Sequence, residues 1–118
     1  MEAASRGAAS VGGSVVGILP GYSDAPNPHV RTVIRTGMGH ARNAIVVASA
    51  DAVVAVGGEA GTLSEIGLAT KLGRPVLGLD LGEGWSARLP GLERVRDIPA
   101  VLAWLESRDD SALDRPLS

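Results

Sequence analysis

The chain has 118 residues, a net charge of −2, 45% hydrophobic residues and no cysteine. This length suits one domain, the small negative charge gives no reason to expect nucleic acid or an anionic membrane as a partner, and the lack of cysteine excludes disulfides and thiolate chemistry. No stretch approaches the roughly 20 apolar residues of a membrane span and no signal peptide is evident, so we expect a soluble cytoplasmic protein.

Short apolar segments alternate with segments of helical periodicity along the chain. We expect helices over residues 1–9, 40–50, 63–72 and 98–106, and strands over residues 14–19, 30–36, 52–56, 76–79 and 93–95. This alternation is typical of an α/β fold with a parallel sheet. We predict a single domain over residues 1–107 and a frayed, charged tail over residues 108–118.

The central feature is an apolar strand that runs into a glycine turn and then a helix. Residues 52–56 are all apolar, as expected for a strand covered on both faces. Thr62 and Glu65 have the spacing of a capping box, with Thr62 as the N-cap. Backbone N–H groups at a helix start bind phosphate. We therefore predict a phosphate-binding turn formed by Gly57, Gly58, Glu59, Ala60, Gly61 and Thr62; the alternative is a glycine turn needed only for packing.

Two motifs carry a family resemblance. The run Gly57-Gly58-x-x-Gly61-Thr62-x-x-Glu65 resembles the signature of the Lonely Guy (LOG) type proteins, which were once labelled lysine decarboxylases and belong to a Rossmann-like group with DprA-like members. The run from Met38 to Asn43 (MGHARN) resembles their second signature. Residues 1–8, 12–21 and 42–58 are more similar still to a branch of uncertain role that resembles the molybdenum-cofactor carrier proteins of algae.

The resemblance implies a doubly wound, Rossmann-like parallel sheet, usually assembled as a homodimer. In LOG-type enzymes the reaction is hydrolysis of the N-glycosidic bond of a nucleoside 5′-monophosphate. By this resemblance Arg42 and Glu65 form the catalytic pair, and the glycine turn holds the phosphate. Decarboxylase chemistry is set aside, because the only lysine, Lys71, lies late in a helix.

The chain departs from the LOG pattern at three points. Val56 stands where LOG proteins have proline before the two glycines, and Asn43 stands where they have lysine. Both departures are shared with the carrier-like branch. The third is the absence of the strand, glycine turn, helix and second strand with which family members begin. We therefore expect an N-terminally truncated sheet that lacks the strands between residues 15–19 and 52–56.

Several residues keep two interpretations. Glu65 is either a general acid/base or only part of a helix cap, and Arg42 either holds substrate charge or is a solvated helix-start residue. Polar residues after two expected strands either line the pocket or form turns; these are Asp24, Asn27, Pro28 and Asp80.

Two functions from different classes follow. One is a LOG-type phosphoribohydrolase, and the other is a non-enzymatic carrier of molybdenum cofactor or a similar pterin phosphate. We predict binding of a phosphorylated, nucleotide-like ligand first, with hydrolysis as an addition. No residue cluster has the spacing of a metal site, and we expect no bound cofactor.

Overall fold

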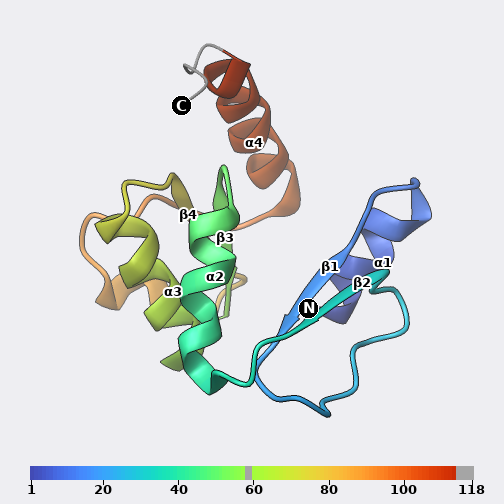
Figure 1. Ribbon diagram of the computed structural model, residues 1–118. Coiled ribbons are helices and arrows are strands. Elements are labelled where there is room, and N and C mark those ends of the chain that lie inside the picture. Colours follow the sequence, from blue (N-terminus) through green and yellow to red (C-terminus); the bar gives the residue numbers. More distant parts are fainter. Residues whose placement is uncertain (58–59, 114–118) are drawn as a thin grey trace. The chain divides into compact units, whose positions relative to one another are not determined.

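The computed structural model describes residues 1–57 and 60–113 (Figure 1). The chain divides into two compact units, Met1–Val46 and Val47–Ser118. The strands form two separate sheets, β1-β2 in the first unit and β3-β4-β5 in the second. Each unit is therefore described by itself.

The first unit contains a helix and a pair of parallel strands. Helix α1 (Glu2–Ser10) precedes β1 (Val16–Leu19) and β2 (Thr32–Arg35), and β1 pairs in parallel with β2. Gly17 allows this packing, because a Cβ there would lie only 2.9 Å from a methyl group of Val30. A short 3-10 helix, η1 (Gly39–Ala41), follows and leads into helix α2 (Arg42–Ser49), whose last residues belong to the second unit.

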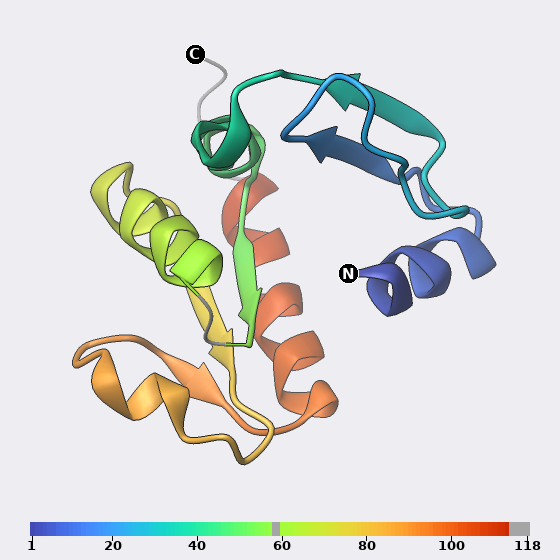
Figure 2. The same ribbon diagram turned by 90° about the horizontal axis from the view of Figure 1, so that it is seen from below.

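The second unit is a parallel three-stranded sheet with its helices on both faces. Its elements in chain order are β3 (Val53–Val56), α3 (Ala60–Lys71), β4 (Val76–Leu79), η2 (Trp85–Arg88), β5 (Arg94–Val95) and α4 (Ile98–Leu113). The sheet order is β3-β4-β5, and both pairings are parallel. Figure 2 shows α3 and α4 on opposite sides of this sheet, the local arrangement of a doubly wound Rossmann-like fold.

Two apolar clusters form the core of this unit, one on each face. Leu77 and Leu79 of β4 pack against Val101 and Trp104 of α4. On the other face, Val53 of β3 packs with Val47 and Ala69. Since side chains of a strand alternate between faces, the predominantly apolar sequences of β3 and β4 match burial on both sides. The α/β class with parallel strands is confirmed.

Some boundaries differ from those expected. Helix α3 begins at Ala60 rather than near Leu63, and α4 continues to Leu113 rather than ending near Glu106. The guanidinium of Arg108 lies 5.3 Å from the centroid of the Trp104 ring. This cation–π contact, one helical turn apart, favours continuation of the helix through a charged stretch. In the part of the chain that the structure describes, no helix is long and apolar enough to cross a membrane.

Candidate functional site

The predicted phosphate turn begins where β3 ends. Gly57 has φ +84°, and a Cβ at this position would meet no atom within 4 Å. The requirement for glycine here is therefore one of backbone conformation and not of space. Gly58 and Glu59 of the predicted turn lie outside the described residues. Helix α3 then starts at Ala60, so its first N–H groups lie just beyond the carboxyl end of β3.

The predicted capping box is wrong. Thr62 is the third residue of α3, and Glu65 lies a turn further along the same helix. An N-cap has non-helical backbone angles, so Thr62 does not fill that position. Gly61 is also helical and does not supply the positive φ that was expected of it. Thr62 and Glu65 are both half-buried, and they are placed one turn apart on the same side of α3.

Arg42 is the first residue of α2, as expected from the second motif. Its Nη1 donates a hydrogen bond of 2.6 Å to the carbonyl oxygen of Ile18 in β1. Its Nε is buried and has no hydrogen-bond partner among the described residues. The side chain is therefore anchored in the first unit and is not a freely solvated arginine. Glu65 belongs to the second unit, so a pairing of Arg42 with Glu65 stays a prediction.

The neighbours of Arg42 have different environments. His40 is exposed in η1. Asn43 is only 2% exposed, and its Oδ1 has no hydrogen-bond partner in the described part of the chain. The departure from the LOG pattern at this position therefore concerns a buried amide and not a surface residue.

Two of the loop residues after β1 act as turn-formers. The Asp24 carboxylate accepts a hydrogen bond of 2.6 Å from the Gly21 N–H. The Asn27 Oδ1 accepts one of 3.0 Å from the His29 N–H, and its Nδ2 donates to Ser5 of α1 at 3.3 Å. These contacts explain Asp24 and Asn27 without a ligand, whereas Pro28 keeps both interpretations.

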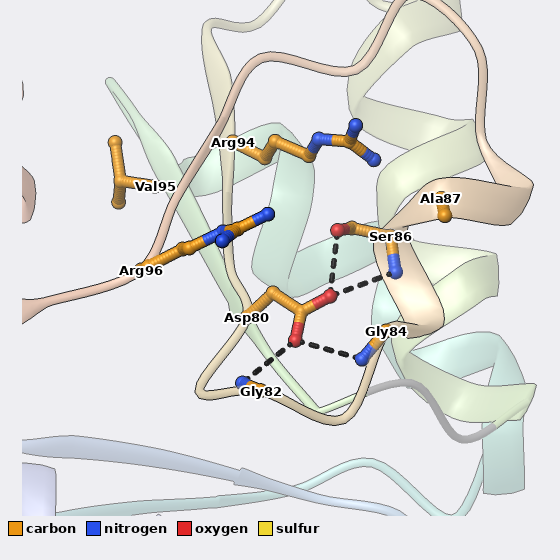
Figure 3. A pocket seen from close by; sticks show the side chains of 8 residues that line it. All are labelled: Asp80, Gly82, Gly84, Ser86, Ala87, Arg94, Val95 and Arg96. Atoms are coloured by element: carbon orange, nitrogen blue, oxygen red, sulfur yellow. Dashed lines mark hydrogen bonds between the residues drawn. The ribbon is translucent and has the colours of Figure 1, made fainter.

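Asp80, the first residue after β4, organises the loop that follows (Figure 3). Its carboxylate accepts four hydrogen bonds, from the N–H groups of Gly82 (3.1 Å), Gly84 (3.0 Å) and Ser86 (3.2 Å) and from the Ser86 hydroxyl (2.7 Å). The Ser86 hydroxyl is the main cause that holds the pKa of Asp80 well below its usual range; burial opposes it, and the three N–H groups assist it. Asp80 and Ser86 are 7% and 2% exposed. The carboxylate is thus a buried, ionised anchor for the loop.

A pocket of about 350 Å³ lies beside this anchor. It is lined by residues from the Asp80 loop, from η2 and from the β5 segment: Asp80, Gly82, Gly84, Ser86, Ala87, Arg94, Val95 and Arg96. In Figure 3 the side chains of Arg94 in β5 and of Arg96, the residue after this strand, extend toward η2. Sequence reasoning did not single out these arginines. The available signal was the run Arg94-Val95-Arg96, because residues two apart on a strand face the same side.

The strand register relates this pocket to the glycine turn. Val56 is paired with Leu79, and Leu79 with Val95. The residues that directly follow these three strand positions are Gly57, Asp80 and Arg96. The Asp80 N–H donates to the Val95 carbonyl at 2.9 Å. We call Gly57, Asp80 and Arg96 the edge row. Ligands bind at this carboxyl edge in open α/β sheets.

The sequence matches a known protein family and an individual relative. The SLOG cluster4 family matches residues 1–99. An uncharacterized protein of Archaeoglobus fulgidus is 52% identical over 79 residues, which are 67% of this chain and 52% of that protein. The chain thus spans about half the length of this relative.

Solved structures extend the likeness to most of the chain. The molybdenum cofactor binding protein of Rippkaea orientalis has a TM-score of 0.78 and 36% identity, over 91% of this chain and 69% of that one. The molybdenum cofactor carrier protein of Chlamydomonas reinhardtii has a TM-score of 0.75 and 31% identity, also over 91% of this chain and 69% of its own. Both agree with the predicted likeness to molybdenum-cofactor carrier proteins.

Proposed function

The chain belongs to the SLOG cluster4 family, and from this premise we propose that it binds a phosphorylated pterin of the molybdenum-cofactor type. The proposed site is the carboxyl edge of β3-β4-β5, with the ligand phosphate at the Gly57 turn and the first residues of α3. The single observation that carries the proposal is this turn, in which a strand ends, Gly57 takes φ +84° and a helix begins at Ala60. The likeness to two proteins, one named as a molybdenum-cofactor binding protein and one as a molybdenum-cofactor carrier protein, supports the choice of ligand.

In this proposal each predicted residue has a role that needs no bond cleavage. N–H groups at the start of α3 and the Thr62 hydroxyl donate to the phosphate. The helix dipole favours the same negative group. Arg42 uses one of its five N–H donors to bind the Ile18 carbonyl of the first unit, and its contact with a ligand stays a prediction. Glu65, half-buried inside α3, does not act as an acid or base.

Hydrolysis of a nucleoside 5′-monophosphate is the competing proposal, since Arg42 and Glu65 both match the LOG pattern. Two observations favour binding without turnover. Asn43 replaces the lysine of the LOG pattern at a buried position, and the solved structures above are named for cofactor binding and not for hydrolysis. A cytoplasmic homodimer also belongs to the proposal; Leu63 of α3 and Leu72, the residue after this helix, are 41% and 48% exposed and are apolar residues that a second copy would cover.

The test of binding compares two threonines of one helix. Protein is incubated without oxygen with molybdenum cofactor released from a molybdoenzyme, freed of excess by gel filtration, and its pterin content measured by fluorescence after oxidation. Thr62→Val is expected to lower retained pterin about tenfold, the loss of one hydrogen bond to a charged group. The control is Thr70→Val, because the Thr70 hydroxyl donates to the Ile66 carbonyl of α3 at 2.9 Å. No retention by the unaltered chain would refute the proposal.

The test of hydrolysis measures free base released from AMP. The binding proposal predicts no turnover above the protein-free rate. Turnover that Glu65→Gln abolishes, but that Glu106→Gln on the exposed side of α4 leaves unchanged, would instead establish the phosphoribohydrolase. Gel filtration with light scattering decides the oligomeric state.

A further inference from the structure

We propose that Arg94 and Arg96 form a second oxyanion subsite, which takes an anionic group of the same ligand whose phosphate lies at the Gly57 turn. The subsite would accept a tetrahedral oxyanion of the phosphate or molybdate class. This inference rests on the proposed function and adds a second anchoring point to it. Its basis is the pocket beside Asp80 and the order of the edge row.

The first argument concerns the charges that face the pocket. Arg94 and Arg96 both line it and are both exposed. Within the described residues, no hydrogen bond or ion pair holds either guanidinium. A guanidinium has five N–H donors in a planar fork that matches the oxygens of phosphate. Two such groups on one wall form a donor-rich surface for an oxyanion.

The second argument explains why Asp80 does not neutralise this wall. A carboxylate offers about four lone-pair directions, and the Asp80 carboxylate already accepts four hydrogen bonds from its own loop. Its oxygens are therefore already hydrogen-bonded to Gly82, Gly84 and Ser86. The charge of Asp80 offsets part of the positive charge, but two arginines against one carboxylate leave the lining with a net charge of +1.

The third argument is spatial. Gly57, Asp80 and Arg96 follow residues that are paired across β3, β4 and β5. Neighbouring strands lie about 4.8 Å apart, so the backbone of Arg96 is roughly 10 Å from that of Gly57. A ligand that lies across the middle strand can therefore place one anionic group at the turn and a second at the arginines. A pocket of about 350 Å³ is at the small end of the range for small-molecule sites, as expected for a subsite.

The experiment has two arms so that the subsite and the proposed function can fail separately. In the first arm inorganic phosphate is titrated into the 118-residue chain, and the arginine Nε–Hε signals are followed by NMR. The expected result is a saturable shift of the Arg94 and Arg96 signals that persists in Gly57→Ala, where the turn is disabled. Absence of that shift, or an equal shift of the exposed Arg88 of η2, would overturn the proposal.

In the second arm the affinity for molybdenum cofactor is compared among Arg94→Gln, Arg96→Gln and Arg88→Gln. The first two are expected to bind about tenfold more weakly, and Arg88→Gln within about twofold of the unaltered chain. All three remove one positive charge from an exposed position, so a general charge effect would move them together and overturn the proposal. If no variant and no unaltered protein binds the cofactor, the proposed function fails while the phosphate arm still decides the subsite.

Discussion

The most informative single change is Gly57→Ala, because its cost in stability and its cost in binding can be separated. Gly57 has φ +84°, and alanine at such an angle costs about 1–2 kcal/mol in strain. Alanine also lowers the conformational entropy of the unfolded chain, which stabilises the folded state by about 0.4–1 kcal/mol. No atom lies within 4 Å of the added Cβ, so no steric term enters. The net loss of unfolding free energy is therefore roughly 1 kcal/mol.

Gly73, which follows α3, provides a matched control. It has φ +71°, and its added Cβ would also meet nothing within 4 Å. The same reasoning gives the same loss of roughly 1 kcal/mol for Gly73→Ala. The two glycines stand near opposite ends of one helix, one at the proposed ligand site and one away from it. The two variants therefore carry the same substitution at the same expected cost in stability, and they differ only in their position relative to the proposed ligand site.

The assay joins urea unfolding with cofactor retention. Unfolding is followed by tryptophan fluorescence, since Trp85 and Trp104 both lie in the unit that contains the two glycines. Both variants should lower the urea midpoint equally, with unchanged slope. Only Gly57→Ala should lose cofactor affinity, by about tenfold or more, because a changed backbone at residue 57 would disturb the proposed phosphate site at the start of α3. Equal affinity of the two variants would refute the assignment of the Gly57 turn.

Three further outcomes follow from the structure. Leu77→Ala should lower the unfolding free energy by about 2–5 kcal/mol, because Leu77 is fully buried, whereas Leu102→Ala, at a side chain 54% exposed, should cost far less in the same urea titration. Asp97→Ala should cost about 1 kcal/mol, since the Asp97 carboxylate accepts a hydrogen bond of 2.9 Å from the Ala100 N–H at the start of α4; Asp97→Asn, which keeps a capping oxygen, should restore most of it. The pKa of Asp80 is lowered by folding, so its contribution to stability is present above about pH 4, the usual range of an aspartate, and is lost as the pH falls further; acid titration of the thermal midpoint should show this loss in the unaltered chain and a smaller one in Asp80→Asn.

The elements that local patterns specify were predictable from the sequence. The strand at residues 53–56, the positive φ of Gly57 and the helix after it are signalled by an apolar run followed by residues with distinct backbone preferences. The start of α3 was misplaced because the S/T-x-x-E spacing of a capping box also occurs inside helices, where i and i+3 are neighbours. The helical state of Arg108 was missed because its contact with Trp104 depends on a ring already fixed in the core.

The arginine pocket shows why a site is harder to predict than a fold. Asp80 was recognised from its position after a strand, but its two interpretations could not be separated without the donors of Gly82, Gly84 and Ser86. Nothing local to Arg94 or Arg96 distinguishes them from other surface arginines. The register of β5 on β4 places them beside Asp80, and this register is a property of the assembled sheet.

The edge row suggests a division of labour among its three members. In the proposed site, Gly57 contributes a backbone N–H without charge and Arg96 contributes charge, while Asp80 holds the intervening loop by accepting hydrogen bonds from its own chain. Weakening the hydrogen bonds of Asp80 should therefore affect phosphate binding at the arginines and not at the Gly57 turn. In Ser86→Ala, which removes the 2.7 Å hydrogen bond to Asp80, phosphate should shift the Arg94 and Arg96 signals less, while Thr62→Val should still lower cofactor retention by the same factor. If Ser86→Ala instead abolished the effect of Thr62→Val, the turn and the arginines would form one inseparable site, and the two-anchor description would be wrong.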